Sequence, residues 1–109
     1  MKILVTGGAG YIGSATAQEL IEEGHQVTVL DSLVTGHREA VPATARFIHV
    51  DLADQGSLDH TFEQGQFDAI MHFAAFIEAG ESMKDPGKFF RNNLINTLNL
   101  LETAVRYGV

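Results

Sequence analysis

The chain has 109 residues, of which 45% are hydrophobic, and a formal net charge of −7. This composition predicts one folded domain with a modest core. The seven basic residues are scattered, so we expect no nucleic-acid partner. There is no cysteine, which excludes disulfides and thiolate metal sites, and no apolar run approaches the roughly 20 residues of a membrane span. We therefore expect a cytoplasmic protein with no membrane partner.

Strands and helices alternate along the chain. Four apolar runs have the character of buried strands: residues 2–6, 26–30, 46–50 and 67–73. Three segments have helical spacing: residues 11–24, 55–65 and 86–107. The segment 31–45 is expected to be irregular, with one short helical turn. The pattern predicts an α/β fold, a partial Rossmann-type doubly wound parallel sheet in the order 3-2-1-4, with a ligand site where the strands end.

Capping residues and a stripe are expected on the later helices. Ser57 is the expected N-cap of the helix over 55–65, and Asp85 is that of the last helix. A stripe on the last helix is expected to be core: Phe90, Leu94, Thr97, Leu98, Leu101, Ala104 and Val105. Three asparagines of that helix are expected to face solvent or a partner: Asn93, Asn96 and Asn99.

The segment VTGGAGYIGSA (5–15) carries the strongest functional signal. Gly7, Gly10 and Gly13 are spaced three apart between a predicted strand and a predicted helix. The first permits a tight turn, Gly10 lets a pyrophosphate approach the backbone, and Gly13 allows the helix to pack closely. Free N–H groups and the helix dipole would then face the phosphates. The alternative is a glycine-rich turn that merely reverses the chain.

Asp31 ends the second predicted strand, 18 residues after Gly13. A carboxylate there accepts hydrogen bonds from the adenosine ribose and repels a 2′-phosphate, and the next basic residue is Arg38. NAD is therefore favoured over NADP, the alternative for Asp31 being a cap at a strand end. Asp51 and Leu52 follow the third strand, where an adenine edge would lie, and Asp51 is equally well explained as a turn residue.

The histidines offer little further chemistry. His49 and Asp51 are two apart on one side of a strand, which is too few ligands for a metal, so we expect no metal site. His72 lies in an apolar strand and is expected to be a partly buried histidine with satisfied hydrogen bonds. After it, the alanines of HFAA (72–75) leave room for a flat ligand or let a loop pack on the glycine turn.

These motifs closely resemble the N-terminal part of the UDP-glucose 4-epimerases, which belong to the extended short-chain dehydrogenase/reductase group. The resemblance runs through the whole chain and is carried by TGGAGYIGS, VLDSLVTGHREAV, DLAD, FDAIMHFAA, AGESMKDPGKFFRNN and TLNLLE. The glycine motif and HFAA are shared widely in that group, whereas GES with DP…FFRNN is more particular to the epimerases. Related nucleotide-sugar epimerases and dehydratases are the alternative.

The resemblance implies a tightly held NAD that removes a hydride from C4 of the sugar and returns it to the other face. It implies that the backbone of Tyr11 and Ile12 touches the pyrophosphate, that Asp51 and Leu52 flank adenine, and that Asn92 reaches toward the cofactor. The residues implied around the adenosine ribose are Asp31, Ser32, Leu33, Val34, Thr35 and Gly36. Those implied along the dinucleotide are Phe73, Ala74, Ala75, Phe76 and Ile77, the last often a lysine in the family.

The family's catalytic residues have no counterpart in this sequence. Such enzymes carry a Ser or Thr and a Tyr-x-x-x-Lys pair, but Ala15 follows Tyr11 at that spacing and only two residues follow Tyr107. We expect no catalytic residue in this single segment, residues 1–109, truncated before the catalytic and substrate-binding parts and inactive alone. The nucleotide sugar would be a partner only of a complete enzyme, and a folded module without cofactor is the other alternative. Self-association is expected at the bare apolar edge of the fourth strand.

Overall fold

The computed structural model describes residues 1–34, 36–74 and 85–109, apart from the side chains of Phe89 and Asn92. Within these ranges it holds a four-stranded parallel sheet in the order β3-β2-β1-β4. The strands are β1 (Lys2–Thr6), β2 (Gln26–Asp31), β3 (Arg46–His49) and β4 (Ala69–His72). The predicted α/β class and strand order are confirmed.

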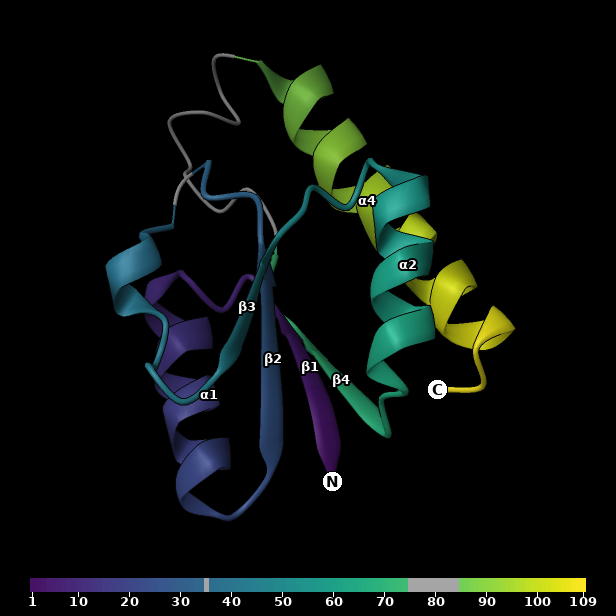
Figure 1. Ribbon diagram of the computed structural model, residues 1–109. Helices are drawn as coiled ribbons and strands as arrows, with labels where there is room; N and C mark the ends of the chain where they lie inside the picture. The colour runs from purple at the N-terminus through teal and green to yellow at the C-terminus, as the bar shows by residue number, and fades with distance from the viewer. Residues whose placement is uncertain (35, 75–84) are drawn as a thin grey trace.

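Helices cover both faces of the sheet. They are α1 (Tyr11–Glu22), α2 (Gln55–Gly65) and α4 (Pro86–Arg106), with the 3-10 helix η1 (Arg38–Ala40) between β2 and β3. Figure 1 shows α1 and η1 on one side of the sheet and α2 with α4 on the other. The η1 turn is the single helical turn expected in the irregular segment. The sheet is the middle layer of three, which explains why its strands are apolar on both faces.

Two apolar clusters hold these layers together. Leu4 of β1 belongs to the cluster under α2 and α4, whereas its neighbours Ile3 and Val5 belong to the cluster under α1. Successive strand residues point to opposite faces, so one short strand serves both cores. Phe62 of α2 meets Phe67 edge to face in the first cluster, with ring centroids 5.7 Å apart. Both faces of the sheet are therefore covered by apolar packing.

Carboxylates cap the starts of α2 and α4. Asp85 caps α4 as predicted, accepting a hydrogen bond from the backbone N–H of Lys88 at 3.0 Å. The prediction for α2 is wrong: its N-cap is Asp54, which accepts hydrogen bonds from the hydroxyl and the backbone N–H of Ser57. These bonds hold the pKa of Asp54 below its usual value. Asp and Ser are nearly equal as N-caps, so residue type alone does not choose between them.

The stripe expected to be core on α4 is wrong for its large side chains. The exposed ones are Phe90, Leu94, Leu98, Leu101 and Val105. Among the described side chains of α4, the buried ones are Asn96, Leu100, Thr103 and Ala104, of which the stripe contained only the last. No helix within the described ranges, α4 included, is long and apolar enough to cross a membrane.

Contacts from α2 and the segment before it explain which face of α4 is buried. Gln55 Nε2 donates to Thr103 Oγ1 at 2.9 Å, and Asn99 Nδ2 donates to the carbonyl of Leu52 at 3.1 Å. These partners satisfy polar side chains that would otherwise be costly to bury. Asn96 is buried and Asn99 is half-buried, contrary to the expectation that they face solvent or a partner.

The two faces of α4 offer a stability test at adjacent positions. Leu100 is 1% exposed and Leu101 is 55% exposed. Leu100→Ala is expected to lower the free energy of unfolding by about 2–5 kcal/mol, because it deletes buried contacts and leaves a cavity. Leu101→Ala is expected to change it by no more than about 0.5 kcal/mol. Urea denaturation measures both, and equal losses would contradict this placement of α4.

Strand β4 lies at one edge of the sheet. Within the described ranges it pairs with β1 alone, and Met71 on it is partly exposed. The self-association expected at this edge stays a prediction.

Candidate functional site

The glycine turn joins β1 to α1 at the carboxyl end of the sheet, and the packing of the chain itself crowds several of its glycines, Gly7 and Gly13 against backbone. Gly7 has φ +72°, and a Cβ on it would lie 2.6 Å from the backbone of Phe73 and Ala74. A Cβ on Gly13 would overlap the carbonyl oxygen of Gly7. The first turn of α1 therefore sits directly on the end of β1, which needs glycine at both positions.

Gly10 differs, because the chain leaves room beside it. Its φ of −83° is ordinary for any residue, and among the described residues a Cβ there would meet just the carbonyl oxygen of Gly7, at 3.4 Å. Neither conformation nor internal packing requires glycine at this position. Gly10 is also the N-cap of α1, where no side chain caps the helix. Glycine would be needed here only if a ligand came close to the backbone. That fits the approach of a pyrophosphate.

Tyr11 and Ile12 follow Gly10 in the first turn of α1. Their side chains are exposed, Tyr11 at 92%. The first N–H groups of a helix have no acceptor within the helix, and the helix dipole adds partial positive charge there. Both residues therefore lie at a helix start that has no side-chain cap and suits an anion.

Asp31, the last residue of β2, is tied to the glycine turn. It is 8% exposed, and its two carboxylate oxygens accept hydrogen bonds from the backbone N–H groups of Ala9 at 2.9 Å and Leu33 at 2.7 Å. A carboxylate has about four acceptor positions, so both oxygens retain capacity for ligand hydroxyls. The alternatives for Asp31 are compatible: it caps the strand end and presents a carboxylate beside the turn.

The loop after β2 packs on the same turn. Leu33 has φ +62°, which is rare for leucine and is a form of backbone strain found at ligand sites. A Cβ on Gly36 would lie 2.9 Å from backbone atoms of Ala9, whose carbonyl accepts from His37 N–H at 3.0 Å. Ala9 was not predicted as a site residue, although its place inside the glycine motif could have indicated it.

The other residues implied around the ribose are less closely bound. Ser32 is half-buried and its carbonyl accepts from His49 Nε2 at 2.9 Å, while Val34 is exposed. Thr35 lies outside the described residues. His49, considered with Asp51 as a metal pair, is thus bonded to backbone. In the part of the chain that the structure describes, no three His, Cys, Asp or Glu residues gather as metal ligands.

Asp51 and Leu52 follow β3 and face different surroundings. Asp51 is exposed and its carboxylate accepts from the N–H of Ala53 at 2.9 Å, which is the turn role weighed as an alternative. Leu52 is buried in the cluster under α2 and α4. The side chain of Leu52 is therefore core, and that of Asp51 remains at the surface.

The end of β4 packs on the glycine turn. The N–H of Phe73 donates to the carbonyl of Thr6 at 2.9 Å, and the backbone of Phe73 and Ala74 closes over Gly7. Close packing of HFAA on the turn is thus observed for its first members. Three implied cofactor residues lie outside the described residues: Ala75, Phe76 and Ile77. Asn92 lies on α4, and its side chain is outside the description.

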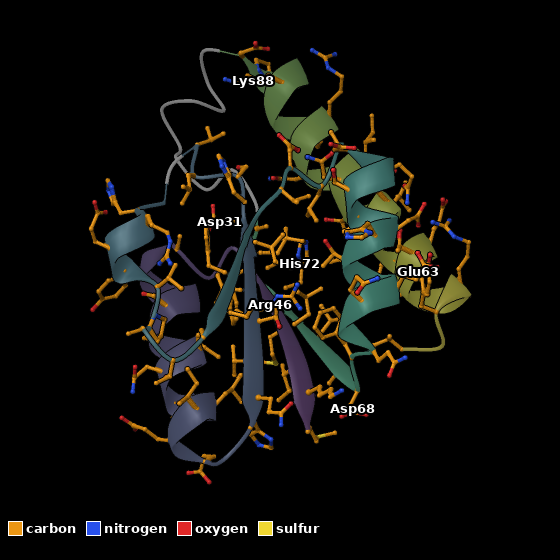
Figure 2. The ribbon with its side chains drawn as sticks, in the orientation of Figure 1. Asp31, Arg46, Glu63, Asp68, His72 and Lys88 are labelled. Carbon is orange, nitrogen blue, oxygen red and sulfur yellow. The ribbon has the colours of Figure 1, made fainter. Side chains whose placement is uncertain are left out.

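His72 is bonded through both ring nitrogens. Its Nδ1 lies 2.6 Å from Thr6 Oγ1 and its Nε2 lies 3.1 Å from Thr97 Oγ1. Desolvation of the ring lowers the pKa of His72 from its usual value. The predicted hydrogen bonds of His72 are thus observed, although the residue as a whole is exposed. Figure 2 shows Asp31 and His72 toward the same end of the sheet, with Asp68 at the opposite end.

These groups fit a dinucleotide and are arranged for binding. The open position at Gly10 and the uncapped start of α1 suit a pyrophosphate. The carboxylate of Asp31 suits sugar hydroxyls and disfavours a second phosphate. What the site offers is donors for an anion and acceptors for a ribose.

Comparison with known proteins identifies relatives in sequence and in fold. Residues 3–109 match the model of the NAD dependent epimerase/dehydratase family. The UDP-glucose 4-epimerase of Lacticaseibacillus casei is 50% identical over 109 residues, which are 100% of this chain and 33% of that protein. UDP-arabinose 4-epimerase 1 of Arabidopsis thaliana is 43% identical over 116 residues, covering 98% of this chain and 28% of that protein.

A solved structure shows the same likeness in three dimensions. The UDP-glucose 4-epimerase of Thermus thermophilus, in complex with NAD, matches with a TM-score of 0.96 at 43% identity, covering 100% of this chain and 35% of that one. The chain thus spans about a third of the length of the relatives it matches. Since the family match covers all but its first two residues, the chain belongs to the NAD dependent epimerase/dehydratase family.

Proposed function

We propose that this chain binds NAD at the carboxyl end of its sheet, with the pyrophosphate over Gly10 and the adenosine ribose beside Asp31. The observation that carries this proposal is the glycine at position 10, which neither backbone conformation nor packing against the described residues requires. The T. thermophilus relative was solved with NAD, which supports the choice of ligand.

The residues of the site divide the work of binding. Backbone N–H groups of Tyr11 and Ile12, at the start of α1, donate to phosphate oxygens. Asp31 accepts from ribose hydroxyls, while its bonds to Ala9 and Leu33 hold both carboxylate oxygens in place. A 2′-phosphate would meet that carboxylate, so NAD binds in preference to NADP.

For the complete protein we propose a nucleotide-sugar 4-epimerase, with UDP-glucose and UDP-galactose as the pair interconverted. Bound NAD would accept a hydride from C4 of the sugar and then return it. Another nucleotide sugar is the alternative, because the A. thaliana relative is a UDP-arabinose 4-epimerase. The 109 residues contain no Tyr-x-x-x-Lys, so we propose that this chain by itself binds cofactor without epimerising sugars.

Isothermal titration with NAD and NADP tests the proposed ligand. Asp31→Asn removes the charge but keeps the shape, and it is expected to weaken NAD binding by about 10–100-fold, because hydrogen bonds to charged groups contribute about 1.5–3 kcal/mol. It should also narrow the preference over NADP. Asp68→Asn makes the same change at the far end of β4, where the carboxylate accepts from Lys2 N–H, and should leave NAD affinity unchanged.

Two results would contradict the proposal. One is equal affinity of the unaltered chain for NAD and NADP. The other is no binding, together with no dinucleotide released when the purified chain is denatured. The second result would establish the alternative, a folded module that holds no cofactor.

A further inference from the structure

A line of hydrogen bonds runs from the glycine turn to α4 through one imidazole. Thr6, the last residue of β1, is fully buried, and its hydroxyl lies 2.6 Å from His72 Nδ1. On the other side of the ring, Nε2 lies 3.1 Å from the hydroxyl of Thr97 on α4. The imidazole of His72 therefore connects Thr6 at the end of β1 with Thr97 on α4.

At one end of this line of hydrogen bonds, Thr6 directly precedes the glycine turn. The carbonyl of Thr6 accepts from Phe73 N–H at 2.9 Å, so β1 and the end of β4 are joined by backbone as well as by the imidazole. The next residue, Gly7, donates its N–H to the carbonyl of Leu30 at 2.8 Å, and a Cβ on it would clash with the backbone of Phe73. A displacement of His72 would thus act on the atoms that shape the turn.

The Thr97 end bears on how α4 is held. The other hydrogen bonds described above for α4 lead toward α2: Thr103 bonds Gln55, and Asn99 bonds the carbonyl of Leu52. The contact of Thr97 with His72 instead joins α4 to a strand. The imidazole therefore adds a polar link to the apolar contacts of Leu100 and Ala104 that hold α4 over the sheet, and its other nitrogen bonds Thr6 at the start of the turn.

We propose that His72 is a positioning residue that couples helix α4 to the glycine turn, so that docking of α4 and NAD binding at the turn stabilise each other. The coupling to NAD rests on the proposed function. A neutral imidazole offers one donor and one acceptor on opposite sides of a rigid ring, and threonine hydroxyls serve in either role. Coupling of this kind is reciprocal: whatever holds α4 tightens the turn, and the reverse.

Variants of Thr97 test the coupling without touching the ring or the turn. Thr97→Val removes the hydroxyl with little change in shape, and Thr97→Ser restores a hydroxyl. Thr61→Val is the matched control, because Thr61 is a buried helical threonine of α2 whose hydroxyl donates to the carbonyl of Ser57 in its own helix. All three variants are made in the full 109-residue chain.

Hydrogen exchange without ligand and NAD titration supply the readouts. In Thr97→Val the amides of Gly7 and Phe73 are expected to exchange about 2–10-fold faster, and the NAD dissociation constant to rise by a similar factor, as expected for one hydrogen bond. Thr97→Ser is expected to restore both values. Thr61→Val is expected to lower overall stability but to leave NAD affinity unchanged. If the role of Thr97 were purely structural, Thr97→Val would give this same result.

The outcomes separate this proposal from the proposed function. Unchanged exchange at Gly7 and Phe73 in Thr97→Val, or failure of Thr97→Ser to rescue, would overturn the coupling while NAD binding by the unaltered chain still supports the function. Faster exchange in a chain that binds no NAD would support the link between α4 and the turn and contradict the function.

Discussion

Gly10→Ala is expected to weaken NAD binding by about 10–100-fold while the chain stays folded, since a lost hydrogen bond to a charged group costs about 1.5–3 kcal/mol. The added Cβ would occupy the space through which a phosphate reaches the backbone. The fold tolerates it, because φ is −83° and the Cβ lies 3.4 Å from the carbonyl oxygen of Gly7. Isothermal titration and urea denaturation of the same samples measure both effects.

Gly56→Ala is the matched control for that loss of binding. Gly56 lies in the first turn of α2, where a Cβ would meet just Asp54, at 3.8 Å, among the described residues. Alanine is favoured over glycine in helices by up to about 1 kcal/mol, so stability is expected to rise slightly with NAD affinity unchanged. Undiminished NAD binding in Gly10→Ala would show that the phosphates do not lie at this turn.

Gly13→Ala is expected to have the opposite profile, a large loss of stability. Its Cβ would overlap the carbonyl oxygen of Gly7, and backbone cannot move aside as a flexible side chain does. Overpacking costs about 1–3 kcal/mol, and sometimes more, from a total of about 5–15 kcal/mol for a typical domain. The midpoint of urea denaturation should fall accordingly. A wild-type midpoint would mean that α1 does not sit on the end of β1 as described.

The sheet, and the residues that meet at the candidate site, could largely be predicted from sequence for local reasons. Strands buried on both faces are continuous apolar runs, such as residues 2–6 and 26–30, and crossover handedness then restricts their order. The glycine spacing and Asp31 were readable because dinucleotide sites need those residue types at those places. The different demands on Gly10 and Gly13 were not readable, because they depend on which backbone atoms come to lie beside each one.

Which face of α4 is buried could not be predicted, because its burial depends on partners distant in sequence. Helical periodicity indicates an apolar stripe, but it carries no information about distant partners. It does not show that Gln55 bonds Thr103, 48 residues away, or that Leu52 accepts from Asn99. Polar residues so satisfied are buried at little cost. The same limit applies to His72, whose two threonine partners come from β1 and from α4.

The most direct test of a cofactor site at the glycine turn is a two-dimensional NMR titration of the ¹⁵N-labelled chain with NAD. The largest shifts are expected at the amides of Gly10, Tyr11 and Ile12, and at Asp31, with little change near Asp68 at the other end of the sheet. Shifts concentrated away from the turn, or no shifts at saturating NAD, would contradict a dinucleotide site at the carboxyl end of this sheet.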